Sequence, residues 1–418
     1  MIITLRLHRC PLLNLNFRLP FLKEYDTFTA MKKEVSIAVQ VETNRAHGRS
    51  MLEGIADYSL AHTEWRLESV EPKALIDSAN LKRYDGFIVR VMDNATAKAL
   101  KQSRKPVIDT YGRVDSGSIP FIRLDDEAIA ETAAECFFDH NFRQCAFCGF
   151  PGLRFSEARG AAFRRIIEKA GGVCNVYDGH RSRLKETFVR KERMDSCSDE
   201  AALRRWAKAL PKPVAVFCCN DIRAFHFLKA CADAGINVPK EVAVLGVDND
   251  KVLCTFSNPP LSSVDTDAFA LGQAAARLLD GMLRGVETPP ASTLHKPHSV
   301  TERTSTESYP TATPWLSDAL VYIRRHIGDG ISADDLIKHI GYSHTTVGKV
   351  FRRELGTSVQ QEIIRQRRKL ACRLLKDASL TAAEISDRCG YPSPQYFSHM
   401  FSAHFGTTPD SWRRDIRP

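Results

Sequence analysis

The sequence lacks several features that would each assign the protein to a definite class. No apolar run approaches the roughly 20 residues that a membrane-spanning helix needs. Residues 1–30 carry scattered basic side chains such as Arg6, Arg9 and Arg18, without the basic start, unbroken apolar stretch and small-residue cleavage site of an export signal. We therefore expect a cytoplasmic protein with no membrane partner.

Signatures of catalysis are also absent. The sequence contains no GxSxG, Walker A or HExxH pattern, and no GxGxxG between a predicted strand and a predicted helix. No pair of carboxylates stands out that would suggest glycoside chemistry. An enzyme is thus the less favoured class, and we expect no catalytic residue and no cofactor.

The cysteine content gives no sign of disulfides or of a metal site. The chain has 12 cysteines and no export signal, which together indicate a reducing compartment. Most of them have apolar neighbours, which is typical of cysteine as a small core residue. Cys145 and Cys148 form a CxxC pattern, but it lies inside a predicted strand and has no second pair at zinc spacing. We favour a core role over metal or redox chemistry.

The first 300 residues alternate between short apolar runs and amphipathic stretches, which predicts a parallel α/β fold. The chain of 418 residues is long enough for two or three domains, and some 270 residues of this pattern favour two lobes. The predicted strands are Val35–Val41, Gly86–Val91, Pro106–Thr110, Phe121–Leu124, Cys145–Gly149, Val214–Cys219 and Val242–Val247. The predicted helices are Ser50–Ala61, Asp126–Phe138, Glu157–Ala170, Ile222–Ala234 and Ala268–Leu283.

Composition also suggests the domain boundaries. Residues 1–31 precede the first strand, and we interpret them as an extension that is disordered or that results from a start assigned too far upstream; the intact mass of the native protein would test this. A Ser-, Thr-, Pro- and Glu-rich stretch near residue 310 predicts a linker at 307–313. It separates a two-lobed domain at 32–306 from an all-helical domain at 314–418.

The helical domain contains the same short motif twice. Ser332 and Asp335, and later Thr381 and Glu384, have capping-box spacing, and each short helix is followed by Gly-Tyr and a second helix. This is the order of a helix-turn-helix, whose second helix lies in the DNA major groove. A predicted helix at Ser358–Ala378 joins the copies, and its 21 residues would span about 31 Å, close to the ~34 Å of one DNA turn. Sequence-specific binding of double-stranded DNA is the leading interpretation, and a helical protein-interaction domain is the alternative.

The periodicity of the second helices separates core positions from DNA-facing ones. Val347, Phe351 and Leu355 recur every four residues, as do Phe397, Phe401 and Phe405. The opposite faces carry side chains that can bond base edges or phosphates. Residues 313–418 also hold 16 Lys+Arg against 11 Asp+Glu, more than half of the net charge of +9. The candidate DNA-binding residues are His344, Thr345, Lys349, Arg352, Arg353, Gln395, Ser398 and His399.

The segment from Gly390 to Arg413 resembles the signature of AraC-type regulators, GY-x-S-x-x-YF-x-x-x-F-x-x-x-x-G-x-TP-x-x-(Y/W)R. The resemblance covers roughly residues 315–415 and implies base-reading positions at Thr345, Gly348 and Lys349 in the first copy. Gly348 departs from the family, where a long polar side chain often stands. By the resemblance, RNA polymerase is a partner and the chain is a homodimer that activates transcription, with repression as the alternative.

The two-lobed domain resembles the effector domain of LacI-type repressors and periplasmic sugar-binding proteins. The similarity rests on residues 214–250, on Pro259-Pro-Leu-Ser-Ser-Val-Asp-Thr-Asp and on Arg303-Thr-Ser305. It implies a sugar effector, and this order of domains makes D-xylose the first candidate, with another sugar or small ligand as the alternative. A transport-type binding protein is disfavoured by the attached DNA-binding module.

Sugar hydroxyls need fixed polar partners at the carboxyl ends of strands, where Asn220, Asp221 and Asp248 stand. The alternative for Asn220 and Asp248 is a purely local role in caps and turns. Arg159 occupies the sugar-clamping position of the family, and Asp125 and Thr266 match pocket positions more loosely. The candidate ligand-binding residues are Asp248, Asn220, Asp221, Arg159, Asp125, Thr266, His47 and Arg49.

Overall fold

The computed structural model describes residues 34–114, 117, 119–179, 199–286, 289–377 and 379–415. Residues 35–418 form one compact unit. The extension expected at residues 1–31 lies outside the described residues. Over the described ranges, no helix combines the length and apolar character that crossing a membrane requires.

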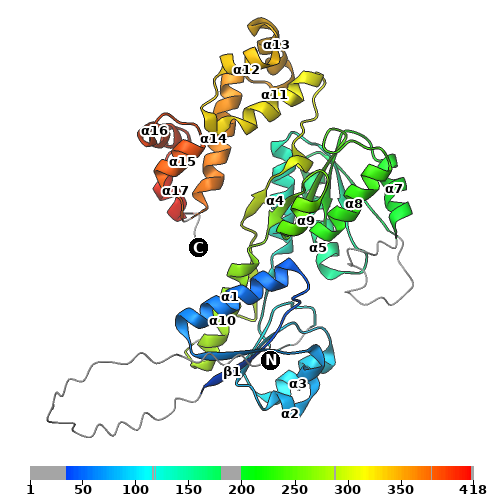
Figure 1. Cartoon of the computed structure of the whole chain (residues 1–418), viewed down its shortest axis with the longest axis vertical. Helices are drawn as coiled ribbons and strands as arrows, with labels where there is room; N and C mark the ends of the chain where they lie inside the picture. The colour runs from blue at the N-terminus through cyan, green and yellow to red at the C-terminus, as the bar shows by residue number, and fades with distance from the viewer. Residues whose placement is uncertain are drawn as a thin grey trace, which may run out of the picture. The chain divides into compact units, whose positions relative to one another are not determined.

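The first lobe is built on a fully parallel sheet with the strand order β11-β5-β4-β3-β1-β2. Helices α1 (Ala46–His62) and α10 (Ala268–Leu283) lie side by side and cover one face (Figure 1). Helices α2 (Ser78–Leu81) and α3 (Asn94–Ser103) cover the other. The strands are β1 (Val35–Gln40), β2 (Trp65–Ser69), β3 (Gly86–Val89), β4 (Val107–Asp109), β5 (Phe121–Leu124) and β11 (Ser292–His295).

The second lobe repeats this plan with the order β12-β10-β9-β8-β6-β7, in which β12 alone runs antiparallel to its neighbour. Helices α4 (Asp126–Asp139) and α5 (Arg154–Lys169) pack on one face, and α7 (Glu200–Ala209) and α8 (Asp221–Asp233) on the other. The short α9 (Lys251–Phe256) follows β9. The strands are β6 (Gln144–Cys148), β7 (Val173–Val176), β8 (Val214–Cys218), β9 (Val242–Val247), β10 (Ser262–Asp265) and β12 (Ser299–Thr301).

The predicted α/β fold with two lobes and a helical domain is therefore confirmed. The chain passes between the lobes after β5, after β10 and between β11 and β12, so each lobe is assembled from separate stretches of sequence. Cys145 and Cys148 of the CxxC pattern are both buried in β6, but they belong to the cores on opposite faces of the sheet. Their thiols thus point apart and cannot share one metal ion or form one redox pair.

The helical domain contains the two predicted helix pairs. Each pair starts with a capping box, at Ser332 before α12 (Ala333–Ile340) and at Thr381 before α15 (Ala382–Arg388). Their second helices are α13 (His344–Leu355) and α16 (Pro394–Phe405). The domain opens with α11 (Pro314–Arg325) and ends with α17 (Pro409–Asp415).

The helix between the pairs is shorter than predicted. Helix α14 (Val359–Leu375) has 17 residues, so it spans about 26 Å rather than the expected 31 Å. It ends early because the side chain of Asp377 accepts the backbone N–H of Ser379 at 2.9 Å, which is a turn and not a further helical residue. The core prediction was also wrong at one position, since Phe405 is 36% exposed while Phe397 and Phe401 are buried.

Helices α1 and α10 approach so closely that Gly272 has no room for a side chain. A Cβ atom there would lie 2.1 Å from the carbonyl oxygen of Met51. We expect Gly272→Ala to lower the free energy of unfolding by about 1–3 kcal/mol, because the backbones must move apart. Thermal unfolding of the full chain measures this. The matched control is Gly348→Ala in α13, where a Cβ meets no atom within 4 Å and the better helix former should leave the melting temperature unchanged or raise it.

Candidate functional site

A pocket of about 110 Å³ lies where strands of both sheets reach their carboxyl ends. This is the position at which open α/β sheets bind ligands. The volume far exceeds the ~10–15 Å³ that a single water occupies by the same measure, so a small organic molecule is the appropriate occupant. The ionisable side chains that line it are Glu42, Arg45, His47, Arg90, Arg123, Asp126, Arg154, Arg159 and Asp248.

Arg159 is the most firmly held of the predicted ligand-binding residues in this pocket. It is 3% exposed on α5, and its guanidinium donates to the Asp126 carboxylate at 2.9 Å and to the Cys219 carbonyl at 2.6 Å. These two acceptors fix the orientation of the planar guanidinium. The directions of its remaining N–H donors are therefore fixed as well. The structure thus presents Arg159 as a rigid polar group on the pocket wall.

Asp248 lines the pocket from the end of β9 with an unusual backbone. Its φ is +102°, a region that non-glycine residues avoid at a cost of about 1–3 kcal/mol. Burial raises the pKa of its carboxyl to about 6, although Arg159 and Arg45 act in the opposite direction. Strain of this kind is concentrated at binding sites, where it aims a side chain that a relaxed backbone would direct elsewhere.

Asn220 and His47 also line the pocket, as predicted from the sequence. The side-chain oxygen of Asn220 accepts the backbone N–H of Arg223 at 2.9 Å, so this residue caps α8 while it faces the pocket. Capping α8 and lining the pocket are therefore compatible for this residue. Burial, with further contributions from neighbouring arginines, lowers the pKa of His47 to about 3 and keeps the imidazole neutral.

The other four predicted ligand-binding residues lie outside the pocket lining. Asp221 is buried and accepts the Ser263 hydroxyl at 2.6 Å and the Asp250 backbone N–H at 2.8 Å, so it braces the loop after β9. Asp125 caps α4. Thr266 is 1% exposed, and Arg49 is exposed with its guanidinium on the Thr43 carbonyl.

Sequence reasoning missed most of the charged lining. Asp126 stands one residue after the predicted Asp125, and it holds both Arg159 and Arg154. Arg45, Arg90 and Arg123 come from the ends of three different strands of the first lobe or from the loop after them. The only signal in the sequence was their position next to a strand end, and many arginines in the chain share that position without lining a pocket.

The predicted DNA-reading faces are open to solvent. His344, Thr345, Lys349 and Arg352 are exposed on α13, while Val347 and Phe351 of the same helix are buried. Gln395 and His399 are exposed on α16, and Ser398 is half-buried. Arg353 differs, because its guanidinium bonds Glu354 at 2.7 Å and the Thr313 hydroxyl at 2.9 Å at the start of α11. His344 lies 3.9 Å from the Asp334 carboxylate, and the other six side chains have no hydrogen bond or ion pair of this kind with a described residue.

A cluster of charged side chains, here called the Glu302 cluster, joins the second lobe to the helical domain. Glu302, which follows β12, forms ion pairs with Arg324 of α11 and with Arg373 of α14, the latter at 2.5 Å. Burial raises the pKa of the Glu302 carboxyl, but Arg324, His140 and Arg373 outweigh it and hold the pKa below its ordinary value. The Glu302 carboxylate of the second lobe is therefore ionised and pairs with two cations of the helical domain.

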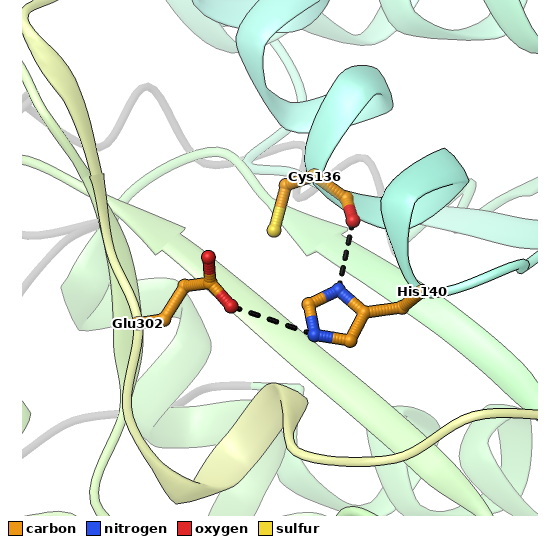
Figure 2. A group of neighbouring side chains, drawn as sticks. All are labelled: Cys136, His140 and Glu302. Carbon is orange, nitrogen blue, oxygen red and sulfur yellow. Dashed lines mark hydrogen bonds and ion pairs between the residues drawn. The ribbon is translucent and has the colours of Figure 1, made fainter. Parts of the chain in front are cut away.

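Cys136, His140 and Glu302 lie close enough to suggest a metal site (Figure 2). His140 Nδ1 donates to the Cys136 carbonyl at 2.8 Å, so Nε2 carries the lone pair, and it accepts from Arg324 at 2.7 Å. The carboxylate that a metal would need already binds two guanidinium groups. With Arg324 on both candidate ligands, the cluster is arranged as an ion-pair network and does not fit a cation.

The segment predicted as a linker is packed against this cluster. Tyr309 is 2% exposed, its ring lies 4.9 Å from that of His140, and its hydroxyl lies 3.4 Å from Arg324. Lys369 of α14 also pairs with Asp139 at the end of α4. The helical domain is thus attached to the second lobe by buried contacts as well as by the chain.

One hydrogen bond connects the sequence neighbour of Asp248 in the pocket with the sequence neighbour of Glu302 in the cluster. Asn249, the neighbour of Asp248, accepts a bond from Arg303 at 2.9 Å and donates to Asp265 at 3.0 Å. Arg303 also donates to the Leu261 carbonyl at 2.8 Å and is adjacent in sequence to Glu302. The residues next to Asp248 and Glu302 are thus hydrogen-bonded to each other.

Comparisons with known proteins agree with this architecture. Residues 134–306 match the profile of the periplasmic binding protein-like domain, and residues 336–415 match that of a helix-turn-helix domain. The chain is 31% identical to the xylose operon regulatory protein of Escherichia coli (strain K12) over 91% of this chain and 97% of that protein. The xylose operon regulatory protein of Haemophilus influenzae is 28% identical over 90% and 97%.

Solved structures give the same result. The structure of a xylose-binding transcription activator superposes with a TM-score of 0.57 at 28% identity, covering 93% of this chain and 100% of that chain. A transcriptional regulator in complex with cellobiose superposes on the two-lobed part with a TM-score of 0.52 at 20% identity, covering 65% of this chain and 84% of that chain, which supports the fold alone. These proteins are transcription regulators and not enzymes.

Proposed function

The chain belongs to the family of the xylose operon regulatory proteins, and from this premise we propose that it is a transcription regulator whose DNA binding responds to a sugar bound between its two lobes. The observation that carries the proposal is the pocket itself, in which Arg159, Asn220 and Asp248 converge at the carboxyl ends of strands. Fixed polar groups of this kind are what sugar hydroxyls require. D-Xylose is the first candidate, because relatives that span nearly the whole chain are named for it.

The proposed mechanism is a shift between two arrangements of the lobes. Groups from both lobes line the pocket, so a bound sugar favours the arrangement in which they contact it together. The displacement is passed through Asn249 and Arg303 to the Glu302 cluster and so to the helical domain. By linkage, the arrangement that binds DNA more tightly must also bind the sugar more tightly if the sugar activates.

The proposal includes partners and a location. Two helix pairs in one chain suit adjacent major grooves, and we propose that a homodimer binds tandem sites near a promoter and activates transcription together with RNA polymerase. The location is the cytoplasm, where DNA and a transported sugar meet. The ligand-binding role of Arg159, Asn220, Asp248 and His47, and the DNA-reading role of the exposed faces of α13 and α16, belong to the same proposal. The domain boundaries at residues 32–306 and 314–418 do so as well.

The experiment that tests the function uses the full chain in two measurements. Thermal unfolding is followed with D-xylose and a panel of other monosaccharides, and duplexes are selected from a random pool with and without each sugar. We expect one sugar to raise the melting temperature, because a ligand of the native state stabilises it, and to change the retention of the selected duplex. Selected DNA with no response to any sugar would leave a DNA-binding protein and contradict the sugar effector.

Gln395 provides a test of the DNA-reading face. A glutamine on a recognition helix can bond an adenine through both the oxygen and the nitrogen of its side-chain amide, and Gln395 is exposed on α16. We expect Gln395→Ala to weaken binding of the selected duplex by about 1–3 kcal/mol and to relax the preference at one base pair. Gln360→Ala, an exposed glutamine on α14, is the control and should leave both affinity and preference unchanged. Equal effects of the two variants would place base reading elsewhere.

A further inference from the structure

The pocket carries more positive charge than a neutral sugar requires. Five arginines and only three carboxylates line it, so its ionised side chains sum to two positive charges. His47 adds none, because burial and the neighbouring arginines lower its pKa to about 3. A buried excess of like charge is costly unless a counter-charge is supplied.

The protein's own carboxylates are already shared. Asp126 accepts both Arg159 at 2.9 Å and Arg154 at 3.0 Å, and Glu42 likewise interacts with two arginines of the first lobe. Each of these carboxylates therefore balances two guanidinium groups. Asp248 is the third carboxylate, and it stands at the Arg159 side of the pocket.

Arg123 differs from these arginines in its ion pairing. It projects from β5 over the Phe121 ring, 5.1 Å from the centroid, and among the described residues no carboxylate lies within ion-pair distance of it. Burial lowers the pKa of its guanidinium and the positive charge of Arg154 lowers it further, and together they outweigh the opposing effect of Asp126, Asp125 and Asp109. Arg154 in turn lies 5.8 Å from the Tyr111 ring, whose other neighbour is Arg90 at 4.1 Å. Arg154 thus neighbours both Arg123 and, across the Tyr111 ring, Arg90.

We propose that the effector is an anionic sugar, with its carboxylate or phosphate group bound by Arg123 and Arg154 and its hydroxyl groups held by Asp248 and Asn220. This inference rests on the proposed function and specifies the chemical class of the effector. Planar guanidinium groups bind carboxylate and phosphate oxygens through paired, charge-assisted hydrogen bonds. The anion relieves the repulsion between Arg123 and Arg154, while Asp248 and Asn220 supply the mixed donors and acceptors that recognise hydroxyl groups.

The test compares matched ligands with the full chain by calorimetry and thermal unfolding: D-xylose, D-xylonate and D-xylose 5-phosphate, and D-glucose with D-glucuronate. We expect at least one anionic sugar to bind tenfold or more tightly than its neutral counterpart, with an affinity that falls as salt is added. A preference for the carboxylates or for the phosphate identifies which anion the subsite takes. Inorganic phosphate and acetate are included, and binding of these alone with equal strength would overturn the proposal.

Arg123→Met tests the residue assignment. The variant should lose the preference for the anionic sugar while its unliganded melting temperature stays the same or rises, because no ion pair is broken. Arg143→Met is the matched control, since Arg143 also stacks on a phenylalanine, Phe138 at 4.9 Å, but lies outside the pocket. If D-xylose binds as tightly as its anionic relatives in the native chain, the anion subsite is refuted while the proposed function stands. If no sugar of either kind binds, the proposed function fails as well.

Discussion

Arg159→Met is expected to cost the sensor most of its ligand affinity and a large part of its stability. The substitution removes a guanidinium that is 3% exposed and leaves the Cys219 carbonyl without its donor and Asp126 with Arg154 as its remaining cation. Removing one partner of a buried ion pair costs about 3–5 kcal/mol, because the other partner stays buried with its charge only partly balanced. Loss of a charge-assisted hydrogen bond to the ligand weakens binding by roughly 10- to 100-fold.

The two effects are measured separately. Urea unfolding, followed by tryptophan fluorescence, gives the free energy of unfolding. Calorimetry with the sugar selected by the thermal-unfolding panel gives the ligand affinity. Arg164→Met is the control, because Arg164 lies on the same helix in an exposed pair with Glu168 and no measurable change is expected there. DNA binding of the Arg159 variant should persist in the absence of sugar. An unchanged unfolding midpoint would show that the buried Arg159–Asp126 pair contributes little to the native state.

Sequence patterns predicted the interior of the fold far better than its edges. Most strands recognised from apolar runs are buried over much of their length, and Val242–Val247 and Val214–Cys218 are fully buried. The four edge strands β2, β7, β11 and β12 were missed, and so was β10 next to the edge. Each edge strand is short and partly exposed, and its residues do not form a continuous apolar run. A pattern based on burial cannot detect strands that are held mainly by backbone hydrogen bonds.

The binding site was predicted in part for a related reason. Asn220 and Asp248 could be located because they stand at strand ends, and Arg159, in the second turn of α5, because its segment has a family resemblance. Arg123 and Asp126 could not, because their role depends on which stretches the crossings between lobes bring together. Asp221 shows the converse error, since a polar residue at a strand end can serve a neighbouring loop through Ser263 and Asp250. Side-chain direction, rather than position in the sequence, decides between the two roles.

The helix-turn-helix pairs were the most predictable part of the chain. Capping boxes, the Gly-Tyr turns and the four-residue spacing of core positions are all local, so the sequence alone determines them. What the sequence did not show is how the pairs are connected to the sensor. That connection depends on Glu302, His140, Arg324 and Arg373, which are separated by up to 233 positions in the chain. In the proposed mechanism, regulation depends on this connection.

Glu302→Gln is expected to uncouple the two binding events, so that a bound sugar no longer changes the affinity for DNA. Glutamine keeps the size of the side chain but removes the negative charge that Arg324 and Arg373 share, so the attachment of the helical domain to the second lobe loses its central ion pairs. In the native chain, a saturating sugar should change DNA affinity by a factor within the usual range of about 5- to 150-fold. In the variant we expect this factor to fall towards one, while sugar affinity stays within roughly twofold because Glu302 does not line the pocket.

The measurement is a pair of DNA titrations of the selected duplex, with and without sugar, for the native chain and each variant. Glu307→Gln is the matched control, since Glu307 lies in the same segment and pairs with Arg325 of α11, which is largely exposed. Its loss should leave the ratio of DNA affinities unchanged, because an exposed ion pair contributes little. If the Glu302 variant keeps the native ratio, coupling runs through other contacts, such as the packing of Tyr309 against His140. If the ratio of DNA affinities falls towards one in both variants, any negative charge in the connecting segment affects the coupling. A specific role of the Glu302 cluster is then excluded.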